Sequence, residues 1–179
     1  MPELSLIPLA ASSITLACAT VTDVRARRVP NWLSYGSLGA ALAWQLAAGS
    51  ASDALLGLLV CGSLGVGLYL LSRMGAGDAK LLMAVGAWLG PGLGVDITLL
   101  TLVGGAAVGV LLLLRAGMLR ATSRDLRLTA LTLATPGART WLPTGGLSFP
   151  FAPVMAASFL CVVFFPAVRP VSAILEQLR

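Results

Sequence analysis

The sequence predicts an all-α, polytopic membrane protein with about six transmembrane helices and with both the N-terminus and the C-terminus outside the cytoplasm. Three observations predict it. Of the 179 residues, 58% are hydrophobic and 11% are charged, whereas soluble domains carry about 25% charged residues. The mean hydropathy is +0.93, and the apolar residues form runs that approach the roughly 20 residues of a membrane span. Basic residues gather between alternate runs, as topology signals do.

Six apolar segments meet or approach the length of a span, and in chain order they are 4–22, 32–49, 54–72, 79–90, 92–114 and 145–168. The first could be mistaken for a secretion signal. It follows Met1, Pro2 and Glu3 instead of a basic stretch, so we expect it to be a retained helix. Only "GPG" at 90–92 separates the fourth segment from the fifth, where Gly and Pro favour a break between two helices.

The basic residues set the orientation. Ten of the twelve fall in the loops after the first, third and fifth segments. The loops after the second and fourth segments contain Asp53 and Asp96 but neither Lys nor Arg. The positive-inside rule therefore places the three basic loops in the cytoplasm and both termini outside. This distribution also argues against nucleic acid as a partner of the +5 chain, because the charges do not form one basic face.

Two aspartates reach the same membrane level in this topology. Asp23 lies where the first span leaves the membrane, and Asp78 lies where the fourth span enters it. Ionisable residues at such positions are costly and therefore candidates for function. Two carboxyl groups that approach closely share one proton, so one can activate water while the other polarises a carbonyl. The chain has no histidine and its three cysteines are far apart, so we expect neither a metal site nor a His-based triad.

The neighbours of these aspartates suit a substrate-binding site. Gly75 and Gly77 flank Asp78 with a backbone that can adopt positive φ angles and lets an extended substrate approach closely. Pro30 favours an extended chain before it. Asn31 is placed either to cap the second helix or to line the site.

These residues also carry a resemblance. "TDVRARRVPNWLSY" (22–35) and "GAGDAKLL" (75–82) resemble the two signature segments of type IV prepilin peptidases, the GxGD aspartyl membrane proteases. "FPFAPVMAAS" (149–158) resembles the opening of the family's last helix. The resemblance implies an aspartic endopeptidase of the bacterial inner membrane with catalytic Asp23 and Asp78. The active-site loop and substrate approach would then comprise Gly75, Gly77, Lys80, Arg25, Pro30 and Asn31.

The same resemblance implies the substrates. They would be prepilins and pseudopilins with a basic leader before a hydrophobic helix, cut at the cytoplasmic face of the bilayer. An acidic residue of the pilin near the cut could pair with Arg25, Arg27, Arg28 or Lys80. The compact chain resembles the peptidases of tight-adherence (Flp-type) pili, and we expect one membrane domain over residues 1–179. It lacks the paired C-x-x-C motifs of the cytosolic insertion in larger members, so we expect no methyltransferase activity and no cofactor.

Two other functions remain open from the sequence. A proton- or ion-coupled transporter would use Asp23 and Asp78 as a relay, although relay carboxylates usually lie near the middle of spans. An inactive subunit of a pilus or secretion assembly would keep the architecture without the chemistry. Removal of the leader from a co-expressed prepilin distinguishes a protease from both of these alternatives.

Overall fold

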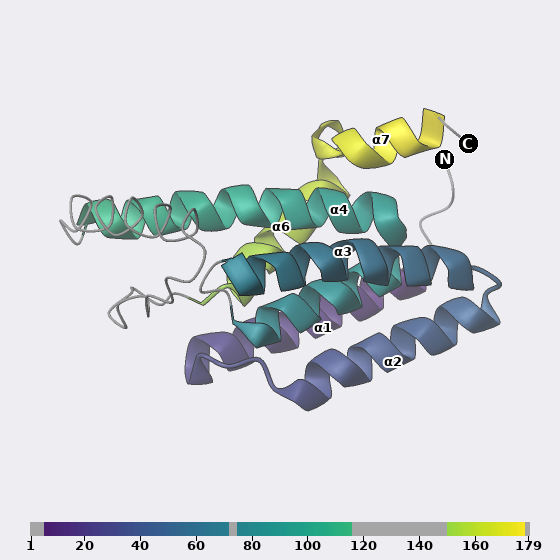
Figure 1. The fold of residues 1–179 in the computed structure, drawn as a ribbon, viewed down its shortest axis with the longest axis horizontal. Coiled ribbons are helices and arrows are strands. Elements are labelled where there is room, and N and C mark those ends of the chain that lie inside the picture. Colours follow the sequence, from purple (N-terminus) through teal and green to yellow (C-terminus); the bar gives the residue numbers. More distant parts are fainter. Residues whose placement is uncertain (1–5, 72–74, 116–149, 178–179) are drawn as a thin grey trace, which may run out of the picture. The chain divides into compact units, whose positions relative to one another are not determined.

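The computed structural model describes residues 6–71, 75–115 and 150–177, and helices are the only regular elements in these ranges (Figure 1). The all-α prediction is therefore confirmed for the described part of the chain. The elements are α1 (Leu6–Ala26), α2 (Asn31–Ala47), α3 (Ala51–Leu71), α4 (Ala76–Arg115), α6 (Ala152–Phe164), the 3-10 helix η1 (Pro166–Val168) and α7 (Pro170–Gln177).

Three of the described helices are long and apolar enough to be membrane spans. By length and composition, α1, α3 and α4 can each cross a bilayer, and α6 is a shorter apolar helix of 13 residues. Each of the six expected segments contains helix in the described residues. Residues 4–5, 72 and 145–149 of those segments, and the basic loop beyond Arg115, lie outside the described ranges. The number of crossings and their orientation stay predictions.

Helix α4 is interrupted where the sequence predicts a boundary. Gly90 has φ 75° and ψ 178°, which is not helical, and Pro91 follows it inside the 40-residue element. A Cβ at Gly94 would lie 3.0 Å from the Cα of Gly86. Eight residues of straight helix span about 12 Å, so the chain folds back at Gly90. The fourth and fifth expected segments are thus two helices, before and after this break.

Small residues let these helices approach closely. A side chain at Gly57 of α3 would overlap the backbone carbonyl of Gly86 in α4, and the buried Cys61 lies beside the same glycine. Membrane helices associate by such close packing, because lipid offers no hydrophobic driving force between them. Cys61 is therefore a packing residue here.

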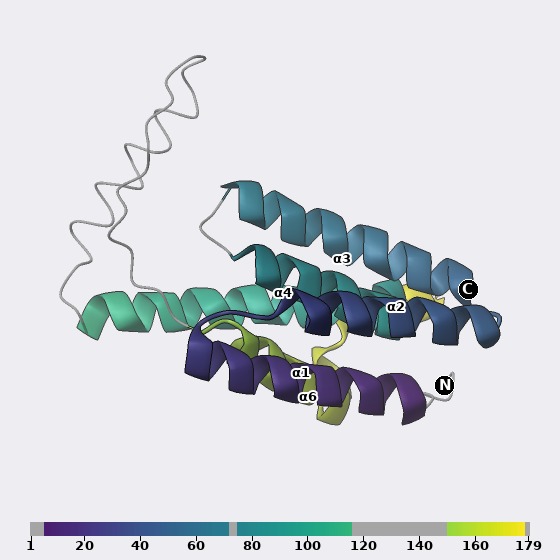
Figure 2. The same ribbon diagram turned by 90° about the horizontal axis from the view of Figure 1, so that it is seen from below.

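The chain forms two compact units, Met1–Gly104 with Pro150–Arg179, and Gly105–Phe149. In the second unit the described residues are the last turns of α4. The first unit has a core shared by α1, α4 and α6, which includes Leu16, Ala19, Leu81, Val85, Met155 and Phe159. Helices α1 and α6 lie side by side (Figure 2). This core positions the ends of the three helices that carry the site.

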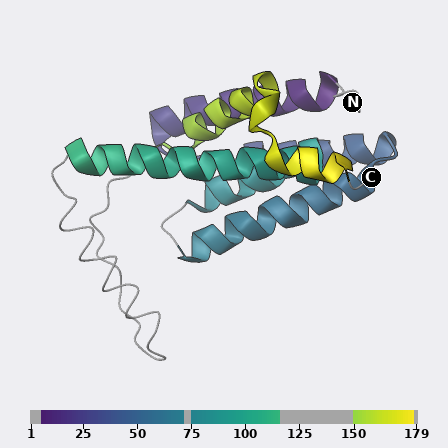
Figure 3. The same ribbon diagram turned by 90° about the horizontal axis from the view of Figure 1, so that it is seen from above.

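Asp96 is not in a loop, as the sequence analysis expected, but inside α4. Its side chain is 2% exposed, and its two carboxylate oxygens accept hydrogen bonds from the N–H groups of Val171 and Ser172 at 2.9 and 3.0 Å. Asp96 therefore caps the N-terminus of α7, which lies beside this part of α4 (Figure 3). The expectation failed because the second half of α4 begins directly after Gly90, five residues before Asp96 is reached.

Candidate active site

Asp23 lies in the last turn of α1, because this helix continues to Ala26. The carboxylate is 6% exposed. Its Oδ2 accepts a hydrogen bond from the N–H of Ala152 at 3.0 Å. The helix ends where Arg27 adopts φ 50°, and the N–H of Arg27 donates to the backbone carbonyl of Asp23 at 2.8 Å. This is a left-handed helix terminus formed without glycine.

Asp78 lies in the first turn of α4 and is partly buried. Its N–H donates to the carbonyl of Gly75 at 3.0 Å, and the backbone of Gly75 also hydrogen-bonds its carboxyl group. The charges of Asp78 and Asp23 interact electrostatically. The structure thus brings together two carboxylates that are 55 positions apart in the sequence, one at the end of a helix and one at the start of another.

Gly75 and Gly77 act through their size and not through their backbone angles. Neither glycine uses its capacity for positive φ, because Gly49 and Gly90 are the glycines with positive φ in the described chain. A Cβ at Gly75 would lie 3.1 Å from Oδ2 of Asp78. A Cβ at Gly77 would lie 3.2 Å from the Cβ of Val29. The first glycine leaves room beside a carboxylate, and the second lets the α1–α2 connection pack on the start of α4.

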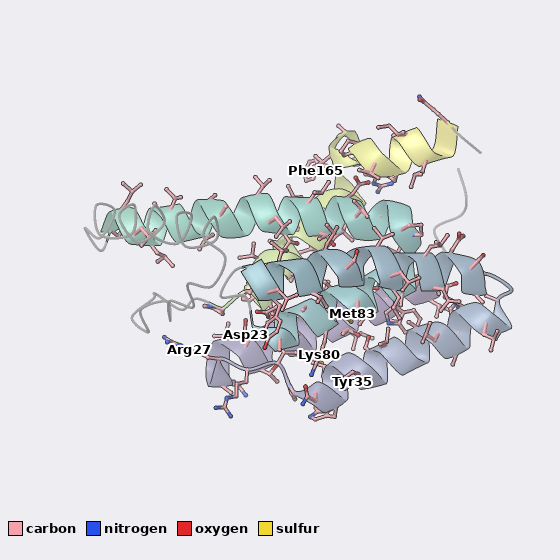
Figure 4. All side chains as sticks on the ribbon, in the orientation of Figure 1. Asp23, Arg27, Tyr35, Lys80, Met83 and Phe165 are labelled. Carbon is pink, nitrogen blue, oxygen red and sulfur yellow. The ribbon has the colours of Figure 1, made fainter. Side chains whose placement is uncertain are left out.

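Asn31 does not cap α2. Pro30 occupies the N-cap position with φ −66° and ψ 139°, and no side chain there accepts a capping hydrogen bond. Oδ1 of Asn31 instead accepts a hydrogen bond from Nζ of Lys80 at 2.9 Å. The same ammonium lies 4.8 Å from the ring centroid of Tyr35. Figure 4 shows Lys80 and Tyr35 pointing toward one another from α4 and α2.

Tyr35 is the residue that the sequence analysis missed. It follows Asn31 by four positions, and residues at this spacing share one face of a helix. That spacing was the available signal. It does not name the partner, because Lys80 comes from another helix.

Arg25, Pro30 and Asn31 lie around one open cavity of about 510 Å³ at the end of α1 and its connection to α2. Arg28 also lines it, and both arginines are exposed. The cavity wall includes Val21 and Thr22, which place it within one turn of Asp23. The structure therefore groups these three predicted residues on one side of Asp23 and groups Gly75, Gly77 and Lys80 around Asp78.

The described residues contain no group of three or more His, Cys, Asp or Glu side chains that could hold a metal ion. The chemistry that this arrangement offers is that of the two carboxylates. A pair with one buried and one partly buried carboxyl group can hold and move a proton between water and a bound carbonyl compound.

An apolar, all-helical chain with helices long enough to cross a bilayer belongs to the class of membrane proteins. Within this class the chain belongs to the type IV leader peptidase family, whose pattern it matches over residues 10–114, more than half of its length. The matched range includes both Asp23 and Asp78 and ends before α6. Neither the curated proteins nor the solved structures give a match.

Proposed function

We propose that this protein is a membrane-embedded aspartic endopeptidase that removes the leader peptide of Flp-type prepilins and pseudopilins. Cleavage takes place at the cytoplasmic face of the bacterial inner membrane. The observation that carries the proposal is the convergence of Asp23 and Asp78. Membership of the type IV leader peptidase family supports a peptide substrate.

The two aspartates divide the work of hydrolysis. One ionised carboxylate takes a proton from water, and the resulting hydroxide adds to the scissile carbonyl carbon while the protonated partner donates to the carbonyl oxygen. The C–N bond of the tetrahedral intermediate then breaks. The amine leaves with the proton that the pair took from water, while a hydroxyl proton of the intermediate returns to the pair and the other product is a carboxylic acid, which ionises in water. One water is consumed, and no covalent enzyme intermediate forms.

The surroundings of the pair suit a strand-like substrate at a membrane surface. Asp23 and Asp78 lie at helix ends, so a peptide bond just outside a hydrophobic helix could reach them. A transporter relay would place its carboxylates near the middle of the spans. An acidic side chain of the pilin near the cut would find cations in Arg25, Arg28 or Lys80.

Co-expression with an Flp-type prepilin tests the proposal. Leader removal is followed on a gel in cells that produce the wild-type chain, Asp23→Asn or Asp78→Asn. We expect the wild type to shorten the precursor and each variant to leave it intact. Processing by both variants, at membrane levels equal to wild type, contradicts the two-aspartate mechanism.

A further inference from the structure

The end of α1 and the start of α6 meet at Asp23. The carboxylate of Asp23 and the N–H of Ala152 form a hydrogen bond of 3.0 Å. Ala152 is fully buried, and Asp23 is 6% exposed. The bond therefore lies in the interior, where a hydrogen bond to a charged group is strong.

The geometry of the two helices explains why this bond forms. The C-terminal end of α1 is unfavourable for a negative charge, whereas the N-terminal end of α6 is favourable. The first N–H groups of a helix have no partner inside it. In α6 the N-cap residue is Phe151, and no side chain caps this helix from that position. The carboxylate of Asp23, which belongs to α1, caps the N-terminus of α6 instead.

Packing fixes this arrangement in register. Leu16 and Ala19 of α1 share a buried cluster with Met155 and Phe159 of α6. The two helices run in opposite directions, since the end of one meets the start of the other. A shift of α6 along α1 would therefore break the bond to Asp23 and disturb this cluster at the same time.

We propose that the first turn of α6 is a positioning element of the active site, in which the Ala152 N–H holds Oδ2 of Asp23. The other carboxylate oxygen, Oδ1, is then left for the water that attacks the substrate. This inference rests on the proposed function. It adds an element that lies outside residues 10–114, the range matched to the family.

Replacement of a single backbone atom tests it. Nonsense suppression in the full chain can introduce lactic acid at position 152, which keeps the methyl side chain and changes the N–H to an ester oxygen. The matched control is the corresponding ester at Met155, whose N–H donates to the carbonyl of Phe151 within the same turn. The probe is a fusion precursor with a lysine-rich leader before an apolar helix.

We expect the ester at 152 to lower kcat roughly tenfold or more per folded enzyme, because it removes a hydrogen bond to a charged group. KM should stay within about twofold. The ester at 155 should lower thermal stability and leave kcat nearly unchanged. Folded enzyme is counted by gel filtration in detergent.

Equal kcat losses for the two esters, or an unchanged kcat at 152, overturn the proposal, since α6 would then act only in stability. The Asp23→Asn and Asp78→Asn chains are assayed beside them. If these variants cleave the fusion precursor, the proposed function itself fails, whatever the esters do.

Discussion

Nζ of Lys80 lies 2.9 Å from Oδ1 of Asn31 and joins the start of α4 to the start of α2. The two residues are 49 positions apart, and each follows one of the two candidate catalytic aspartates within eight positions. Their bond therefore connects the chain segments that carry Asp23 and Asp78. The ring of Tyr35, 4.8 Å from the ammonium, supports it from the next turn of α2.

Loss of the Lys80–Asn31 bond should lower activity by separating these segments. We expect Lys80→Met and Asn31→Leu each to lower kcat/KM about fivefold, which corresponds to about 1 kcal/mol of transition-state stabilisation. The double variant should lose about as much as either single variant, because one change already breaks the bond. Kinetic measurements with a purified prepilin compare the wild type, the two single variants and the double variant. Losses that multiply in the double variant would show that the residues act independently.

Gly77 should be intolerant of a side chain for a reason that a second change can remove. A Cβ at this position would lie 3.2 Å from the Cβ of Val29, so Gly77→Ala should displace the α1–α2 connection and lower kcat severalfold. Val29→Ala in the same chain makes room and should restore part of the activity. In Gly36→Ala, where nothing lies within 4 Å, we expect unchanged activity and a stability gain of about 0.5–1 kcal/mol. Failure of Val29→Ala to help would refute the steric explanation.

The sequence singles out Asp23 and Asp78 as a candidate pair but does not predict the contacts around them. Asp23 and Asp78 can be paired in advance because charge in the loops orders the spans, and the spans then place both residues at one level. The bond from Lys80 to Asn31 depends on which faces of two helices meet, and no short-range pattern contains that information. Ala152 is even harder to foresee, since its side chain is inert and its backbone N–H makes the contact.

The same reasoning applies to the two glycines and explains the error at Asp96. A glycine in "GAGD" indicates either unusual backbone angles or lack of space, and the two readings look identical in one sequence. In the structure the reason is lack of space, because a side chain at either glycine would crowd neighbouring atoms. Asp96 follows a Gly-Pro-Gly stretch and looks like a loop residue. It lies within a helix because Gly90 alone makes the turn.

Asp96 should contribute to stability and not to catalysis. Its carboxylate caps α7 through the N–H groups of Val171 and Ser172, so both of its oxygens are engaged away from the start of α4. In Asp96→Asn an amide NH2 group replaces one carboxylate oxygen, so one of the two backbone N–H groups of α7 loses its acceptor. We therefore expect a loss of about 1–3 kcal/mol in the free energy of unfolding. kcat per folded enzyme should not change. Reversible denaturant unfolding in detergent gives the first quantity, and a tenfold drop in kcat would contradict the assigned role.

The orientation in the membrane gives the last prediction. If the loop between α1 and α2 is cytoplasmic, as its three arginines indicate, then the connection between α2 and α3 is outside. Single cysteines at Ala26 and Ala48, both exposed positions, distinguish the two sides in a chain whose Cys18, Cys61 and Cys161 are replaced by alanine. In spheroplasts, an impermeant maleimide should label Ala48→Cys directly and Ala26→Cys only after the membrane is opened. Cleavage of the fusion precursor by the Ala26→Cys and Ala48→Cys chains shows that each is folded. The reverse labelling pattern would place Asp23 and Asp78 on the outer side, where a cytoplasmic leader could not reach them.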